Sequence, residues 1–274
     1  MIIAPTAETL GATVEGVDLA QPLGHAEFAA ILKALGEYGV LRFPTQRLDA
    51  AQMKAFSSRF GALEVNVAGA YQEPGHPEVM ILSNIVENGM PIGARDAGQD
   101  WHTDMSYSET IALANMLYAI KVPRRDGQPL GGTEFANMHG AYDALPDEIK
   151  TRLDGMTALQ DFNKFWEMMR LRPGSWRKPM SPEQRALKPP VSHPVFLTHP
   201  ITGRKVLYCN PGYAIRINEL PERDSDDMLE YLFDHQLQPR SATSTAGPRA
   251  TCCSGTISAP CTTHMPITAT TSTA

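Results

Sequence analysis

The chain has 274 residues, of which 42% are hydrophobic, enough to bury one large core or two modest ones. Its net charge of −6 excludes the basic surface typical of proteins that bind nucleic acid or anionic membranes, so a small-molecule partner is expected. No apolar run is long enough to span a membrane and the first residues lack a signal-peptide pattern, which predicts a cytoplasmic protein.

The N-terminal part carries two amphipathic helix patterns with a short strand between them. Residues 25–35 place apolar side chains at helical intervals, and Gly36 is expected to end that helix. The strand "GVLRF" follows. Asp49 then precedes a second helix, with Gln52 placed as in a capping box and Gly61 placed as the stop. The order helix, strand, helix is therefore predicted for this region.

The middle of the chain is richer in strands. The apolar runs 78–84 and 111–122 have polar and proline boundaries that favour buried strands, although the second run also fits a helix. A helix is expected from about Pro146 to Gly155. Residues 162–190 mix aromatic and basic residues with several prolines, and we interpret them as a long surface excursion or lid.

Two further elements complete the regular pattern. The stretch "HPVFLTHPITGRKVLYCNP" predicts a hairpin with "PITGRK" as its turn, and "SDDMLEYLFDH" predicts a final helix capped by Ser225. Strands in the middle with helices around them favour a mainly β fold with helical insertions, α+β in class. Residues 1–239 are expected to form this one domain.

Residues 240–274 change character abruptly. They hold ten threonines and five serines but no Asp, Glu, Leu, Val, Phe, Tyr or Trp. A stretch without large apolar side chains is not expected to supply the closing strands of a core. Two explanations stay open, a naturally disordered tail and a shifted reading frame.

The stretch "GQDWHTDMSYSE" places His102 and Asp104 two residues apart. On a strand such residues share a face, so the imidazole and the carboxylate can converge on one metal ion. With a remote histidine they would form the two-histidine, one-carboxylate triad of non-haem iron(II). Alone the pair is weak evidence, because chance also produces it and two polar residues on a strand are the simpler explanation.

Five segments in a fixed order make the chain resemble the α-ketoglutarate-dependent dioxygenases that include taurine dioxygenase and 2,4-dichlorophenoxyacetate dioxygenase. They are "GATVEGVDL", "GVLRFPTQRLDAAQMKAFSSRFGALE", "DWHTDMSY", "GGTEFANMHGAYDALPDEIK" and "HPVFLTHPITGRKVLYCN". The resemblance implies a double-stranded β-helix (jelly roll) core flanked by helices. It also implies Fe(II) as the metal, and α-ketoglutarate and O₂ as co-substrates. The implied reaction forms succinate and CO₂ while it hydroxylates a small organic acid or sulfonate.

The resemblance also implies roles for single residues. His102 and Asp104 become catalytic metal ligands. Thr133 in "GGTEF", where the family usually has Gly-Gly-Asp-Thr, becomes the residue that binds a carboxylate of α-ketoglutarate. The family's distal Trp-Asp-Asn, histidine and arginine are not legible in the chain as written. His264 is the only histidine after His235 and is the candidate third ligand.

Six residues are candidates for lining a substrate pocket, although a solvated lid explains the last three equally well. They are Asn66, Tyr71, Met105, Phe165, Trp166 and Arg170. Asparagine at position 66, where the taurine enzyme has a histidine for the sulfonate, argues against taurine as the substrate. Trp101, His193 and His199 are expected to be structural.

A shifted frame would account for the missing distal motif. Read from the third base of the preceding codon, the junctions of residues 254–257 permit Trp, Asp and Asn among other residues, and the junction of Cys261 with Thr262 permits Tyr or His. Two hypotheses follow, an active dioxygenase and a non-catalytic relative without the distal histidine and arginine. A carbohydrate-binding jelly roll is a third and has little support. No nucleic-acid or membrane partner is expected, and self-association into a homo-oligomer is compatible with the composition.

Overall fold

The helices lie in three regions of the chain. A computed structural model describes residues 1–6, 10–65, 71–95, 100–130, 133–175 and 177–238, and describes residues 129, 242–245, 250–254 and 262–264 by their backbone alone. The helices within these residues are α1 (His25–Tyr38), α2 (Ala50–Ser57), the 3₁₀ helix η1 (Ser58–Phe60), α3 (Met138–Asp143), α4 (Asp147–Leu153), α5 (Phe162–Arg170), α6 (Pro182–Ala186) and α7 (Glu222–Gln236). Together with the strands they confirm a mainly β fold with helical insertions.

The strands of the described residues are short, and all of their pairings except that of β2 with β3 are antiparallel. One sheet has the order β1 (Ile2–Pro5), β2 (Ala12–Glu15), β3 (Val40–Pro44), β18 (Ala250–Ser254), β8 (Asn115–Tyr118). Two sheets have three strands, β17 (Ala242–Thr245), β11 (Thr133–Ala136), β19 (Thr262–His264) and β13 (Val191–Pro194), β12 (Thr157–Gln160), β16 (Ala214–Ile217). Strand pairs are β14 (Phe196–Thr198) with β15 (Lys205–Leu207), β4 (Gln72–Glu73) with β5 (His76–Met80), β6 (Val86–Glu87) with β7 (Met90–Pro91), and β9 (Arg124–Arg125) with β10 (Gln128–Pro129).

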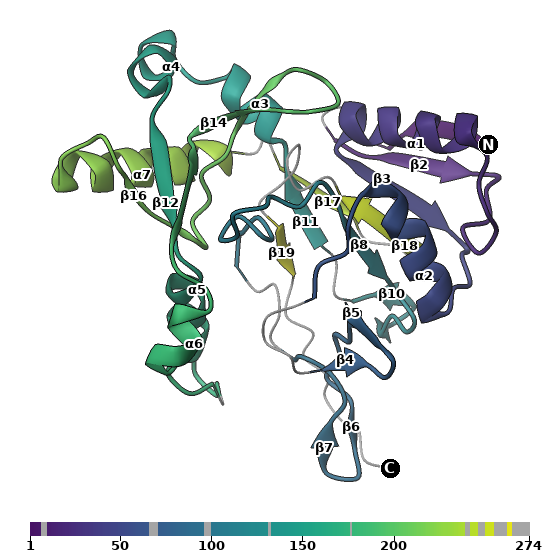
Figure 1. Cartoon of the computed structure of the whole chain (residues 1–274). Helices are drawn as coiled ribbons and strands as arrows, with labels where there is room; N and C mark the ends of the chain where they lie inside the picture. Colours follow the sequence, from purple (N-terminus) through teal and green to yellow (C-terminus); the bar gives the residue numbers. More distant parts are fainter. Residues whose placement is uncertain are drawn as a thin grey trace.

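Two hydrophobic cores hold these layers together. Figure 1 shows α1 and α2 beside β2 and β3, and α7 beside β12 and β16 at the other end of the molecule. The first core buries Ile31 and Leu35 of α1 against Phe43 of β3. The second core buries Leu232 of α7 against Ile217 of β16. Burial of such side chains stabilises each by about 1.5–3 kcal/mol relative to exposure, so the cores fix the sheets that carry the site.

The end of α1 lies beyond the expected position. Gly36 does not stop the helix, which continues to Tyr38. Gly39 caps it with a φ of 69° and donates its amide to the carbonyl of Leu35 at 2.8 Å. Gly36 instead allows close packing, because a Cβ there would lie 2.7 Å from Cγ2 of Ile201. The sequence pattern therefore identified the right kind of residue at the wrong position.

The capping box predicted for α2 is confirmed. The Asp49 carboxylate accepts the amide of Gln52 at 2.8 Å, and the Gln52 side chain accepts the amide of Asp49 at 2.9 Å. Replacing Asp49 by alanine removes one of these two hydrogen bonds. We expect Asp49→Ala to lower the free energy of unfolding by about 1 kcal/mol. Urea denaturation of both proteins measures this difference, and an unchanged midpoint would contradict it.

Other local predictions are confirmed with small shifts. The helix α4 follows Pro146 as expected. The predicted hairpin is formed by β14 and β15, with Phe196 opposite Leu207. The two apolar runs become β5 and β8, which cover less of the sequence than the runs themselves. Elements set by local signals were therefore recognised, whereas their boundaries were not.

Ser225 does not cap α7. The helix begins at Glu222, directly after Pro221, so Ser225 lies inside it and is fully buried. Its hydroxyl accepts the backbone amide of Ile217 at 2.8 Å and so ties α7 to β16. A serine near the start of an apolar helical pattern is normally read as an N-cap. Here the same hydroxyl bonds the backbone of a neighbouring strand, which the sequence does not reveal.

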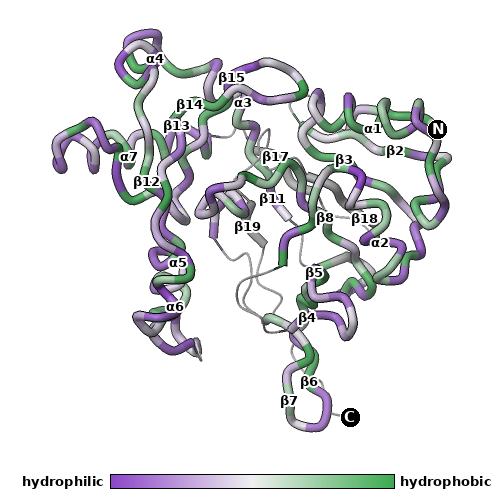
Figure 2. Tube along the Cα trace, in the orientation of Figure 1, coloured by the Kyte–Doolittle hydropathy of each residue, from purple (hydrophilic) through white to green (hydrophobic). Residues whose placement is uncertain are grey.

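The excursion 162–190 is more than a surface lid. Its helix α5 buries Phe165 and Met169, which are spaced four residues apart and therefore face the same side. The helix α6, by contrast, is mostly hydrophilic along its trace (Figure 2) and has no buried residue. The expectation that this region stays outside the core is therefore wrong for α5.

The backbone of the tail also pairs, although we expected it to supply no strands. β18 lies between β3 and β8, while β17 and β19 flank β11. Ladder hydrogen bonds need only backbone groups, and threonine favours strands, so large apolar side chains are not required for pairing. The alternate-frame motif falls largely on residues 255–261, which lie outside the described residues. The domain division at residue 239 stays a prediction.

Candidate metal centre

The two predicted ligands come together in a loop. His102 Nε2 lies 3.2 Å from Asp104 Oδ1. His102 is a β-bridge residue but Asp104 lies in a turn, so the two do not share one strand as expected. The chain turns at Asp104, and Met105 adopts a φ of 60°. The turn directs the Asp104 carboxylate toward the His102 imidazole. On a strand, the two side chains would instead have met because residues two apart share a face.

The orientation of His102 is fixed by its surroundings. Its Nδ1 donates a hydrogen bond to the backbone carbonyl of Asp100 at 2.6 Å, which leaves Nε2 for a metal ion. Gly212 packs against the ligand, since a Cβ at that position would lie 2.9 Å from the Cβ of His102. His102 is only 5% exposed. Its imidazole is therefore held in one orientation.

The Asp104 carboxylate is oriented by a hydrogen bond from Asn115. Nδ2 of Asn115, the first residue of β8, donates to Asp104 Oδ2 at 2.5 Å. The Asp104 side chain is 38% exposed, so it is reachable from solvent while His102 is not. One carboxylate oxygen is thus occupied by Asn115, and the other faces the imidazole.

Aromatic side chains form a wall beside His102. The rings of Phe165 and Tyr213 lie 5.4 Å and 6.3 Å from the imidazole, and the ring of Tyr107 lies 4.7 Å from that of Tyr213. Burial raises the pKa of both tyrosines, which therefore stay neutral phenols at physiological pH. This wall, with Met169, excludes water from one side of the pair.

The pair fits a first-row metal ion. An ion bonded at about 2.1 Å to two ligands at a right angle holds them about 3 Å apart, close to the observed 3.2 Å. Burial of His102 favours its neutral form, but the Asp104 carboxylate and the hydrogen bonds to Asp104 and Asp100 outweigh this, and the pKa of His102 is raised above 6.5. In the metal-free protein the pair is therefore an ion pair at pH values below the raised pKa of His102, and a bound cation would replace the imidazole proton.

The affinity for a divalent metal is expected to fall by about tenfold per unit as the pH drops below the raised pKa of His102. A protonated imidazole has no lone pair for the metal. In the metal-free protein the ion pair stabilises the fold fully below pH 6.5, and this stabilisation is lost as the pH rises through the raised pKa. Co(II) titrations between about pH 6 and pH 8.5 measure the slope. An affinity that is constant over this range would contradict it.

A third ligand does not adjoin the pair within the residues that the structure describes, where no group of three or more His, Cys, Asp and Glu side chains is suited to hold a metal. The backbone of His264 lies in β19, opposite Thr133 of β11. The two residues that the sequence assigned to the third ligand and the co-substrate are thus neighbours in one ladder. Their roles stay predictions.

The predicted pocket residues divide into three groups. Phe165 adjoins His102, and Met105 packs against the same aromatic cluster. Trp166 and Arg170 contact the excursion itself, because Trp166 Nε1 donates to Lys178 O at 2.8 Å and Arg170 Nε donates to Glu167 Oε2 at 2.8 Å. The others are Tyr71, which has a φ of 62° before β4, and Asn66, which lies outside the described residues.

The three residues expected to be structural, His193, His199 and Trp101, hold the fold. His193 Nε2 donates to the carbonyl of Ser108 at 2.9 Å, and His199 Nδ1 accepts the amides of Ile201 and Thr202. Burial lowers the pKa of His199 to about 4, so its neutral form makes these bonds. Trp101 packs against the second core.

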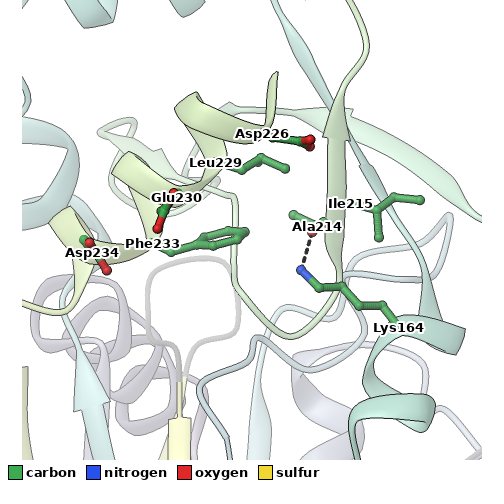
Figure 3. A pocket seen from close by; sticks show the side chains of 8 residues that line it. All are labelled: Lys164, Ala214, Ile215, Asp226, Leu229, Glu230, Phe233 and Asp234. Carbon is green, nitrogen blue, oxygen red and sulfur yellow. Dashed lines mark hydrogen bonds between the residues drawn. The ribbon is translucent and has the colours of Figure 1, made fainter. Parts of the chain in front are cut away.

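A separate hollow of about 430 Å³ lies between α5, β16 and α7 (Figure 3). Lys164 points into it and donates to the carbonyl of Ala214 at 2.7 Å, and burial lowers the pKa of that lysine. Asp226, Glu230 and Asp234 of α7 line its other side. It contains none of the predicted site residues.

Sequence reasoning missed Asn115, Tyr107, Tyr213 and Gly212. Asn115 left a usable signal, because it is a lone amide inside the apolar run 111–122. Tyr107 lies within the quoted segment "DWHTDMSY", but Tyr213 left no signal, since it comes from a different segment that meets the loop only in the folded chain. The Gly212 position is likewise visible only from the approach of His102.

The chain is similar to known proteins over most of its length. Residues 3–246 match the family model described as "Taurine catabolism dioxygenase TauD, TfdA family". The chain is similar to an alpha-ketoglutarate-dependent 2,4-dichlorophenoxyacetate dioxygenase of Cupriavidus pinatubonensis, with 32% identity over 250 residues, 87% of this chain and 83% of that protein. It is also similar to pentalenolactone F synthase of Streptomyces avermitilis, with 30% identity over 241 residues, 84% of this chain and 77% of that protein.

Solved structures show the same likeness. The crystal structure of a taurine dioxygenase from Burkholderia xenovorans matches with a TM-score of 0.74 and 25% identity, covering 96% of this chain and 82% of that chain. The match extends over nearly the whole chain and confirms the expected jelly-roll fold with flanking helices.

Proposed function

This chain belongs to the TauD, TfdA family of α-ketoglutarate-dependent, non-haem iron dioxygenases, and we propose that it hydroxylates a small organic acid or sulfonate. Enzymes of this family use Fe(II), α-ketoglutarate and O₂. The observation that carries the proposal is the buried His102 with Nε2 at 3.2 Å from Asp104 Oδ1. We assign these two residues as iron ligands.

The residues around the pair have distinct tasks. Iron, when bound, would supply the oxidation that couples the decarboxylation of α-ketoglutarate to hydroxylation of the substrate. His102 and Asp104 hold the metal, and Asp100 and Asn115 keep the two ligands oriented. The aromatic wall of Tyr107, Phe165 and Tyr213 keeps water out of the site.

We assign further roles that support the same reaction. The hydroxyl of Thr133 donates to a carboxylate of α-ketoglutarate, and Phe165 and Met105 contact the substrate. The relatives are named for different substrates, among them 2,4-dichlorophenoxyacetate, and this agrees with an organic acid as the substrate class. No helix among the described residues has both the length and the apolarity to cross a membrane. Whether the chain forms a homo-oligomer stays a prediction.

Iron-dependent turnover tests the proposal. The full chain is incubated with Fe(II), α-ketoglutarate and O₂ and a panel of phenoxyacetates, aliphatic carboxylates and sulfonates, and succinate and the hydroxylated product are quantified. We expect at least one carboxylate or sulfonate to yield both in equal amounts, and taurine to yield neither. Succinate formation that does not depend on iron would contradict the proposal, as would a full panel without product.

A catalytically impaired relative is the second candidate. It is favoured by the sequence, in which the family's distal Trp-Asp-Asn, histidine and arginine are not legible in the chain as written. Sequencing the coding DNA across codons 235–274 bears on this alternative. An alternate frame that reads Trp-Asp-Asn and then His would identify an active parent and a damaged chain, whereas an unrelated frame would leave His264 as the candidate ligand.

A further inference from the structure

Two contacts join the excursion to the metal loop, which we define as residues 100–108. Nη2 of Arg172, just beyond α5, forms an ion pair with Asp100 Oδ1, at the start of the loop. Lys188 Nζ donates to Ser108 Oγ at 3.4 Å at the end of the loop and lies 5.8 Å from the ring centre of Tyr107. The excursion therefore holds the loop at both of its ends, with His102 and Asp104 between them.

The ion pair of Arg172 acts on the same residue, Asp100, that orients the proposed metal ligand His102. The backbone carbonyl of Asp100 accepts the Nδ1 hydrogen of His102, and its side chain binds Arg172. Oδ2 of Asp100 is buried and has no hydrogen-bond partner among the described residues. The ion pair of Oδ1 with Arg172 therefore compensates the negative charge of the Asp100 carboxylate. The ion pair limits the movement of Asp100, and the backbone carbonyl of Asp100 sets the ring orientation of His102.

The same helix also contacts His102. Phe165 of α5 lies 5.4 Å from the imidazole, ring centre to ring centre. The excursion is held together around this helix, because Trp166 Nε1 donates to Lys178 O at 2.8 Å and Arg177 lies over the Trp166 ring at 4.6 Å. Movement of α5 would therefore disturb Asp100 through Arg172 and His102 through Phe165 at the same time.

We propose that Arg172 is a positioning residue whose ion pair with Asp100 fastens α5 to the metal loop and so holds His102 in the orientation that iron binding requires. The inference rests on the proposed function, because it assigns Arg172 a task in that same site. The ion pair is about one-third exposed, with 35% and 30% of its two side chains accessible. Its loss should therefore change local stability by a modest factor, about threefold to fivefold.

The test uses Arg172→Met, which keeps the aliphatic stem, Asp100→Asn, the double variant and Arg172→Lys. Arg185→Met is the matched control, because Arg185 is an exposed arginine of α6 in the same excursion. Amide hydrogen exchange of residues 100–108 and 162–170 is measured on the metal-free full chain. The dissociation constant for Fe(II) is then measured anaerobically in the presence of α-ketoglutarate, from the charge-transfer absorption of the complex.

We expect Arg172→Met and Asp100→Asn each to raise exchange in both segments and to weaken iron binding about threefold to fivefold. The double variant should be no worse than either single variant, Arg172→Lys should restore most of the affinity, and Arg185→Met should change neither quantity.

Unchanged exchange in Arg172→Met would overturn the proposal. Faster exchange with unchanged iron affinity would also overturn it, because Arg172 would then be structural only. A wild-type chain without any charge-transfer absorption would overturn the proposed function, and with it the role of Arg172 toward iron, whereas the exchange rates would still decide whether Arg172 fastens the loop.

Discussion

Replacing His102 or Asp104 by alanine is expected to abolish stoichiometric iron binding and, with it, the turnover of α-ketoglutarate. The two side chains provide the donor atoms that lie 3.2 Å apart, and the other residues around them orient these donors without supplying new ones. Losing a ligand should weaken iron binding by more than about 100-fold, the upper end of what losing an outer-shell partner costs. Anaerobic Fe(II) titration measures this loss.

His25→Ala is the matched control, because His25 is an exposed histidine at the start of α1, remote in sequence from the loop. It should bind iron as the wild-type chain does. Far-UV circular dichroism should show the wild-type helix content in His102→Ala and Asp104→Ala, since both residues lie outside the helices. Stoichiometric iron retained by either His102→Ala or Asp104→Ala would remove the assigned ligands from the site.

Asn115→Leu is expected to weaken iron binding by about 10-fold to 100-fold without unfolding the protein. The amide of Asn115 holds Asp104 Oδ2 at 2.5 Å, and leucine has a similar size but no donor. The carboxylate would then lose one of the contacts that fix its direction toward the metal. Titrations with Fe(II) and with Co(II) should both show the loss.

Met116→Leu provides the control for this experiment. Met116 is the next residue on β8 and packs against the first core, so the substitution conserves volume beside the same strand. It should leave the metal affinity unchanged. If Asn115→Leu binds iron as tightly as Met116→Leu, the hydrogen bond from Asn115 to Asp104 is not required for metal binding.

Local signals allowed much of the fold to be read from the sequence. The capping box of Asp49 and Gln52 and the hairpin around Gly203 depend on neighbours within a few residues, so their physical cause is visible in the chain itself. The helix α5 was missed because the excursion that it begins is rich in basic residues and, after the helix, in prolines. Its burial depends on contact with His102 and Tyr213, which are distant in sequence.

The candidate site shows the same division. The His102–Asp104 pair lies within three residues and was recognisable, together with the resemblance that gave it meaning. Asn115 and Gly212 act on it from other parts of the chain, and only the folded structure brings them there. The tail was judged by its lack of apolar side chains, whereas strand pairing depends on the backbone.

Anaerobic titration of the full chain with Fe(II) in the presence of α-ketoglutarate tests the central claim most directly. We predict a visible charge-transfer absorption that saturates at one iron per chain and is absent from Asp104→Ala. A wild-type chain that gives no such absorption, or an Asp104→Ala chain that gives the same absorption, would contradict the assignment of His102 and Asp104 as the ligands of an iron-dependent dioxygenase.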